Sequence, residues 1–264
     1  MDTLIGLLGL ILGAAINGLA DSLPRSRGLQ RPHCRACGAP RPPRAWSSLL
    51  GLATGARRCA YCGISQAWRA PILEILAVAG SLWLYHRDPT AGVFWKGLLV
   101  SAVLLLIVVT DLEHRLIPHV VTGPAAIAFA LLGVFDPSRG PLKTLAGGLV
   151  GLGLFYVLYL LGGVFARLVA RRRGHPLDEV AFGFGDVTLA GVIGLAVGWP
   201  GVLVALVLGI MAAGAYSLAY LLVLLIRRRY TAFIPIPYGP FMVLGALIVY
   251  FRLWTAVGAG LAGG

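Results

Sequence analysis

Long apolar runs separated by short polar segments make up most of this chain. A helix needs about 20 apolar residues to cross the hydrocarbon core of a bilayer. The pattern therefore predicts an all-α polytopic membrane protein with about eight transmembrane helices. Some helix ends are poorly marked, near Trp199-Pro200 and after Phe233, because prolines blur them. The predicted spans are 3–20, 72–87, 93–110, 119–135, 143–166, 186–204, 205–226 and 239–257.

The composition agrees with a membrane protein. Of the 264 residues, 58% are hydrophobic and 12% are charged, and the mean hydropathy is +0.86, which excludes an ordinary soluble globular domain. A net charge of +12 could indicate nucleic-acid binding. The basic residues, however, lie in short runs between the apolar stretches, as topology signals do, so we expect no nucleic-acid partner. Asp2 stands where a cleaved signal peptide would have a basic start, which argues against such a signal.

The positions of Lys and Arg predict the orientation. If the first polar loop, about 21–71, lies in the cytoplasm and the spans alternate, the cytoplasmic segments hold 17 of the 22 Lys and Arg residues. The simplest interpretation of the arginine runs 171–173 and 227–229 is that they anchor helix ends on the cytoplasmic side. They could also hold acidic lipid or an acidic substrate segment. The opposite orientation would violate the positive-inside rule. With eight spans, both termini then face away from the cytoplasm.

Two carboxylates stand at the ends of apolar runs, where an ionisable residue is costly and indicates a function. Asp111 ends the third predicted span and Asp186 begins the sixth. Because the third span runs inward and the sixth outward, we expect both aspartates at the cytoplasmic face. Gly183 and Gly185 precede Asp186 and carry no side chain, so they are candidates for a cleft in which a substrate backbone approaches the carboxylate.

A pair of close carboxylates can perform aspartic-protease chemistry. Two such groups cannot both ionise easily, so they share a proton. The ionised group takes a proton from water, and the protonated group polarises a peptide carbonyl and later protonates the leaving amine. The same pair could instead act as a proton or cation relay in a transporter. The residues alone favour the protease only slightly and leave both functions open.

All four cysteines lie in the first loop. Cys34 and Cys37 form one C-x2-C pair, Cys59 and Cys62 form a second, and 21 residues separate the pairs. Each pair can offer two thiolates to one ion, and together they complete a tetrahedral zinc site. The alternative is two disulfides, which the reducing cytoplasm disfavours. We therefore expect a structural Zn²⁺ that holds the 21–71 loop together.

Glu74 and two histidines are further candidates. Glu74, just inside the second span, is either a third functional carboxylate in the substrate cleft or a rim residue at a helix N-terminus, where negative charge is favoured. The sequence leaves both interpretations open. His114 and His119 flank the segment after Asp111, and we expect them to be solvated loop residues rather than catalysts.

These motifs together resemble those of the type IV prepilin peptidases, membrane aspartic proteases of the GxGD class. Gly183-Phe184-Gly185-Asp186 matches the class motif, and Asp111 with Ile117-Pro118 matches its first aspartate segment. The other matching positions are Gly13, Asn17, Leu23, Pro24, the two C-x2-C pairs, Pro71, Glu74, 179–187, Ile193, Gly194, Gly198, Trp199, 234–241 and Gly245. The resemblance extends from about residue 13 to 245, which is almost the whole chain.

The resemblance implies a reaction and a division of the chain. Such enzymes remove the short basic leader of type IV prepilins or pseudopilins after a glycine, at the cytoplasmic face of the bacterial inner membrane, while the substrate's apolar helix stays in the lipid bilayer. It implies that Asp111 and Asp186 are the catalytic pair of a membrane aspartic peptidase domain, 93–257. The N-terminal part, 1–92, is associated with a second activity, N-methylation of the new N-terminus by S-adenosylmethionine.

The chain departs from the family pattern at several positions. His119 stands where the family often has Asp or Asn, and Thr188 stands where it often has Lys. Ala14-Ala15 and Asp21-Ser22 replace the usual Ser-Phe and aromatic-Arg pairs. None of these changes removes a catalytic carboxylate. The N-terminal changes bear on the methyltransferase, for which the sequence also offers no glycine-rich nucleotide loop.

Overall fold

The structure is a computed structural model that describes residues 1–23, 32–173, 183–227 and 237–253. Contacts along the backbone divide the chain into two compact units, Met1–Thr110 and Asp111–Gly264. The described residues form helices and turns, and the β-pairing among them is confined to isolated bridges. Some predicted motif positions lie outside the described residues: Pro24, 179–182, Arg228, Arg229, 234–236 and 254–257, together with the side chains of 171–173.

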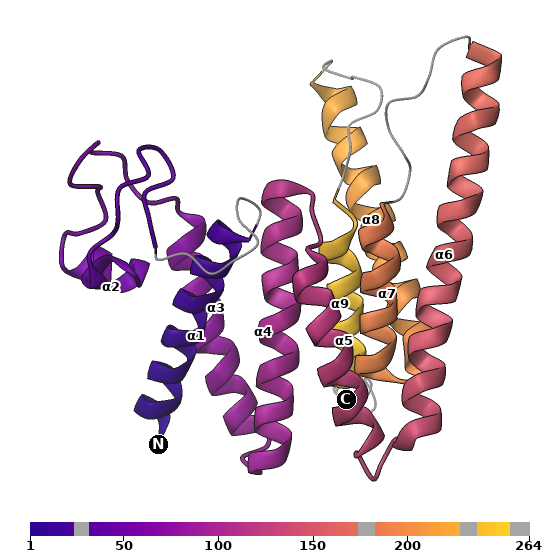
Figure 1. The fold of residues 1–264 in the computed structure, drawn as a ribbon, viewed down its shortest axis with the longest axis horizontal. Coiled ribbons are helices and arrows are strands. Elements are labelled where there is room, and N and C mark those ends of the chain that lie inside the picture. The colour runs from indigo at the N-terminus through magenta and orange to yellow at the C-terminus, as the bar shows by residue number, and fades with distance from the viewer. Residues whose placement is uncertain (24–31, 174–182, 228–236, 254–264) are drawn as a thin grey trace. The chain divides into compact units, whose positions relative to one another are not determined.

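The first unit is built on a pair of long helices. Its elements are α1 (Asp2–Ser22), the 3₁₀-helix η1 (Pro43–Ala45), α2 (Ser48–Ala53), α3 (Arg69–Arg87) and most of α4 (Ala91–His114). Helices α1 and α3 lie side by side (Figure 1). Gly9 and Gly13 of α1 make this possible, because a Cβ at Gly13 would lie 2.8 Å from the Glu74 Cα and one at Gly9 would lie 2.7 Å from the Val78 Cα. Small residues four apart are a common way for membrane helices to approach closely.

The second unit is arranged around a buried helix. Its elements are α5 (His119–Val134), α6 (Gly140–Arg173), α7 (Phe184–Val197), α8 (Gly201–Ile226) and α9 (Gly239–Tyr250). Helix α7 contacts α5, α6, α8 and α9 (Figure 1). Apart from Thr188, it is apolar on all sides after its first turn, which is the pattern of a helix in the centre of a bundle. The core of the unit therefore begins directly after Asp186.

Glycines bring α6 and α7 into backbone contact. A Cβ at Gly147 would lie 2.5 Å from the Gly194 carbonyl oxygen, and one at Gly148 would lie 2.6 Å from Leu195. Gly151 likewise lies against the Ala190 carbonyl group. The four-residue spacing of Gly147 and Gly151 places both on one face of α6. Any larger residue at these positions would separate α6 from the helix that carries Asp186.

A helix lies at each predicted apolar run, but only some of these helices are long and apolar enough to cross a membrane, and α3 is not among them. Among the described helices, four are long and apolar enough to cross a membrane: α1, α4, Gly140–Leu168 of α6, and α8. Helices α5, α7 and α9 are apolar but shorter. The predicted boundary at 204 is wrong, because α7 ends at Val197 and α8 begins at Gly201. Gly198 ends α7 with a φ of +73°, a conformation that favours glycine. An assumed span length of about 20 residues extends the predicted helix past this break.

Candidate active site and cysteine centre

Asp111 is a buried carboxylate in the last turn of α4. Its exposed fraction is 6%. The Gly239 backbone N–H, at the start of α9, donates a hydrogen bond of 3.0 Å to Asp111 Oδ2 across 128 positions of sequence. A Cβ at Gly239 would lie 2.5 Å from the same oxygen. Gly239 therefore both holds the carboxylate and gives it the room to approach the backbone of α9.

Asp186 lies in the first turn of α7. Its Oδ2 accepts a hydrogen bond of 3.1 Å from the Gly183 backbone N–H, which is the arrangement of a helix-capping carboxylate. The positive end of the helix dipole favours a negative charge at this place. The α7 N-terminus therefore fixes both the position and the direction of the Asp186 side chain.

The two aspartates come together in the second unit. Asp186 lies within electrostatic range of Asp111, so each carboxylate disfavours a charge on the other. Gly185 packs against Ile117, because a Cβ at Gly185 would lie 3.0 Å from the Ile117 Cβ. Its missing side chain therefore makes room for the segment that follows Asp111. Gly183, by contrast, is exposed, and a Cβ there would meet no atom closer than 3.8 Å.

Two neighbours of the pair, Gly239 and Tyr238, were not predicted as site residues. Gly239 binds Asp111, and Tyr238 lies within electrostatic range of Asp186. The His119 ring contacts the Phe184 ring edge-on, with 5.9 Å between centroids. The Tyr238-Gly239-Pro240 segment was recognised as a motif, but nothing in the sequence says which carboxylate it meets. The available signal was Gly239 followed by Pro240 at the start of the predicted span 239–257, which the span count puts at the same depth as the aspartates.

The four cysteines form one cluster. Their Sγ atoms all lie within 4.8 Å of one another, and both the Cys34–Cys62 and Cys37–Cys59 pairs are 3.6 Å apart. All four thiols are free. With Zn–S bonds of about 2.3 Å, neighbouring sulfurs of a tetrahedral site lie about 3.8 Å apart, whereas a disulfide needs about 2.05 Å. The spacing therefore fits a bound metal ion and not the alternative of two disulfides.

Each C-x2-C pair lies in the same kind of turn. The Gly38 N–H donates to the Cys34 carbonyl and the Gly63 N–H to the Cys59 carbonyl, both at 2.9 Å, and the two glycines have φ of +72° and +71°. The backbone amides of Cys37 and Ala36 point at the Cys34 sulfur and lower the pKa of that thiol to about 6. The turns therefore present at least one sulfur as the thiolate that a metal ion binds.

Glu74 connects the cysteine segment, residues 32–66, to the pair of helices α1 and α3. It is fully buried. Its Oε2 accepts from the Ser47 hydroxyl at 2.7 Å and the Leu49 N–H at 2.9 Å, while Oε1 accepts from the Ser48 N–H at 2.7 Å and Asn17 Nδ2 at 3.5 Å. The carboxylate thus satisfies the donors at the start of α2, which an isolated helix leaves unpaired. The nearby Asp21 adds ion pairs with Arg69, at 2.6 Å, and with Arg35 of the first cysteine turn.

Removing this carboxylate should destabilise the first unit. In Glu74→Gln one carboxylate oxygen becomes an NH₂ group, which faces either the Ser48 N–H or the Ser47 and Leu49 donors and leaves those donors unpaired. We expect about 1–3 kcal/mol for each buried donor left unpaired, and a lower midpoint of thermal unfolding in detergent. Glu113→Gln, the same change on the last turn of α4, is the matched control. An unchanged unfolding midpoint for Glu74→Gln would contradict this assignment.

Comparison with known proteins matches two stretches of the chain. A sequence model of the type IV leader peptidase family matches residues 98–218, and one of the bacterial peptidase A24 N-terminal domain matches residues 7–87. The chain belongs to the type IV leader peptidase family. The first match contains both aspartates. The second contains all four cysteines and Glu74.

Curated relatives carry the corresponding names. The prepilin leader peptidase/N-methyltransferase of Aeromonas salmonicida strain A449 is 25% identical over 75% of this chain and 62% of its own length. That of Legionella pneumophila is 26% identical over 83% and 70%. The type 4 prepilin-like proteins leader peptide-processing enzyme of Escherichia coli O78:H11 is 28% identical over 87% and 76%. The chain thus spans less than two thirds of the Aeromonas relative. No solved structure matches the chain.

Proposed function

We propose that this protein is a prepilin leader peptidase, an aspartic endopeptidase that removes the short basic leader of type IV prepilins or pseudopilins after a glycine. The observation that carries the proposal is that Asp111, in the last turn of α4, lies near Asp186, in the first turn of α7. The names of the relatives supply the substrate class. A proton relay in a transporter would need the same carboxylates but would cleave nothing.

The mechanism follows from the two carboxylates. The ionised carboxylate takes a proton from a water molecule while the water oxygen attacks the carbonyl carbon of the scissile glycine. The other, protonated, hydrogen bonds to the carbonyl oxygen, and a proton then passes to the leaving amine as the C–N bond breaks. Gly239 orients Asp111 and Gly183 orients Asp186 through backbone N–H groups. The exposed backbone at Gly183 is where we place the approach of the substrate chain, and Gly185 completes that wall of the cleft.

The Gly239 contact gives a direct test of this orientation. In Gly239→Ala the new Cβ would displace the Asp111 carboxylate, so kcat should fall by roughly a hundredfold, as expected when a catalytic group is misplaced by about 1 Å. The measurement is steady-state cleavage of a prepilin-like substrate. Gly214→Ala on α8, where a Cβ meets open space, is the control. Equal kcat in Gly239→Ala and wild type would remove Gly239 from the mechanism.

The proposed setting is the bacterial inner membrane. The chain would cross it about eight times, with the aspartates on the cytoplasmic side and both termini on the other. Support comes from the Lys and Arg distribution and from a helix at each predicted apolar run. The substrate would be held with its apolar helix in the bilayer. We propose no nucleic-acid partner.

The N-terminal part, 1–92, is proposed to hold a structural Zn²⁺ on Cys34, Cys37, Cys59 and Cys62. The donor set is four sulfurs at tetrahedral spacing, which fits this ion. When bound, zinc supplies only a cross-link between the two turns. The peptidase chemistry is proposed for the remainder, 93–257, and needs no metal.

N-methylation of the new N-terminus is a second proposed activity of the N-terminal part. A cavity beside the cysteine segment, lined by Asn17, Asp21, His33 and Trp46 among others, has a volume of about 20 Å³. That is room for about one water molecule, whereas small-molecule pockets measure roughly 300–1,000 Å³. This cavity does not fit S-adenosylmethionine.

The decisive experiment is a cleavage assay. The purified chain is mixed with a peptide that has a basic leader, a glycine and an apolar helix, and the product masses are measured. Cleavage after the glycine supports the proposal. A further mass increase of one methylene group, dependent on added S-adenosylmethionine, would establish methylation. A folded protein that cleaves no substrate of this kind would overturn the proposal.

A further inference from the structure

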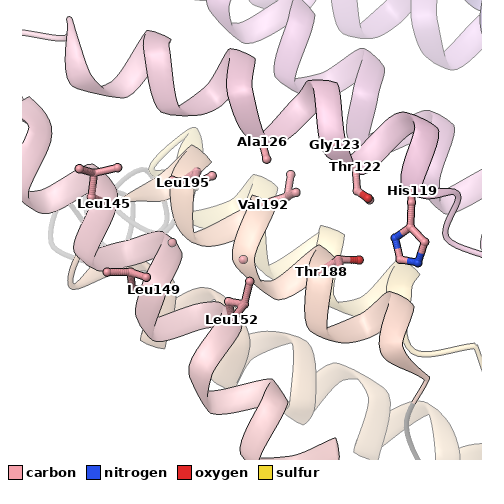
Figure 2. A pocket seen from close by; sticks show the side chains of 12 residues that line it. His119, Thr122, Gly123, Ala126, Leu145, Leu149, Leu152, Thr188, Val192 and Leu195 are labelled. Carbon is pink, nitrogen blue, oxygen red and sulfur yellow. The ribbon is translucent and has the colours of Figure 1, made fainter.

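An apolar groove runs along the second unit beside the aspartates. It lies between 119–126 of α5, 145–152 of α6 and 188–195 of α7, and has a volume of about 380 Å³. Figure 2 shows the side chains that line it. Each helix contributes positions i, i+3, i+4 and i+7, which follow one helix face over two turns, or about 10 Å. The volume is typical of a binding cleft.

One end of the groove is polar and adjoins the candidate active site. Thr188 lies two residues after Asp186 on α7, and His119 contacts Phe184, which lies one turn before Thr188 on the same helix face. His119, Thr122 and Thr188 come from the starts of α5 and α7 and lie together in Figure 2, whereas Leu145 and Leu195 lie toward the opposite end. Asp186 and Thr188 lie about 200° apart around α7, so a chain held at Asp186 would pass over the first turn of that helix to enter the groove.

The groove is shaped by small residues. Gly123 is exposed, and a Cβ placed on it would meet no atom within 4 Å, so the space above it is open. Ala126 points into the groove one turn further along α5 (Figure 2). At the rim, Leu149 is 72% exposed. Small residues under an open apolar face allow a second helix to approach closely, and an apolar helix fills such a groove with side chains at i, i+3, i+4 and i+7.

We propose that this groove is the docking site for the first two apolar turns that follow the scissile bond of the substrate. The inference rests on the proposed function and deepens it. The peptide bond would lie at Asp111 and Asp186, and the chain on the amine side would enter the groove beside His119 and Thr188. Apolar side chains of the substrate would then cover Gly123, Ala126 and Leu149. The groove would thereby set which bond reaches the carboxylates.

The test compares two substrates and three variants of the full chain. The long substrate has leader, glycine and apolar helix; the short one ends in polar residues soon after the glycine. Gly123→Leu and Ala126→Leu each fill the groove. Gly153→Leu on α6 adds the same side chain in open space outside it and is the control.

Filling the groove should reduce the preference for the long substrate. We expect the ratio of kcat/KM, long over short, to fall roughly tenfold or more in both groove variants, mainly through KM, because an apolar binding contribution is lost. The ratio should not change in Gly153→Leu. An unchanged ratio in folded, active groove variants would overturn the inference. So would a loss of co-purified phospholipid with an unchanged ratio, which would identify a lipid chain as the occupant.

A second measurement does not depend on the folding of the groove variants. A photoreactive amino acid in the first apolar turn of the long substrate is crosslinked to the Asp186→Asn protein, which holds the substrate uncut. Labelling within 119–126, 145–152 or 188–195 supports the inference, and labelling confined to other segments overturns it. Failure of the wild type to cleave either substrate would overturn the proposed function, and this inference with it.

Discussion

Asp111→Asn and Asp186→Asn should each abolish leader cleavage. An amide can neither take a proton from water nor deliver one to the leaving amine, and each aspartate has a task that the other cannot perform alone. We expect kcat to fall at least roughly a thousandfold in either variant. The measurement is the initial rate of product formation from the long substrate, read by mass. Because the pair acts as a unit, the double variant should be no slower than the slower single variant.

Both substitutions keep the shape of the side chain, so folding can be tested separately. In Asp111→Asn the amide oxygen can still accept from Gly239, and in Asp186→Asn from Gly183. Unfolding midpoints should therefore stay close to that of wild type. Glu113→Gln, the same kind of change two residues from Asp111, should cleave at the wild-type rate. Wild-type cleavage by a folded Asp186→Asn protein would exclude Asp186 from catalysis.

The common depth of the aspartates stays a prediction, and it rests on patterns that are local in sequence. Apolar length marks each span, and the Lys and Arg count gives its direction, so Asp111 and Asp186 could be placed on the same side. The described structure has a helix at each predicted run. The four cysteines were similarly predictable, because their spacing carries the geometry of the metal site.

The partners of the carboxylates could not be predicted, because they depend on how distant segments pack. Gly239 meets Asp111 from 128 positions away. Glu74 had two open interpretations, and its contacts with Ser47 and Leu49 decide how it is held without deciding its role in catalysis. The helix boundary near Gly198 is only roughly predictable, because Trp199-Pro200 blurs the helix ends and a span length of about 20 residues favours a later end.

Loss of the metal should unfold the segment that holds the cysteines and destabilise the rest of the first unit, Met1–Thr110. Structural zinc contributes about 10–16 kcal/mol in zinc-finger peptides, so a segment held by four thiolates depends on it. In Cys37→Ser we expect the zinc content to fall well below one ion per chain and proteases to cut within residues 32–66. Once Ser47, Ser48 and Leu49 leave Glu74, its carboxylate keeps only the Asn17 amide as a partner, at a cost of about 1–3 kcal/mol for each buried group left unsatisfied. The unfolding midpoint of the whole protein should therefore fall as well.

A control in the same turn separates loss of the ligand from a general disturbance. Tyr61→Ser lies between Cys59 and Cys62, where the tyrosine is 76% exposed, and it should keep both zinc and protease resistance. A chelator added to the wild type should reproduce the effect of Cys37→Ser and release four alkylatable thiols without any reductant. Full zinc content and full cleavage activity in Cys37→Ser would refute the structural role of the metal. Thiols that become alkylatable only after reduction would show disulfides in place of the ion. Full leader cleavage by a Cys37→Ser protein in which residues 32–66 are unfolded would confine the role of the metal to stability.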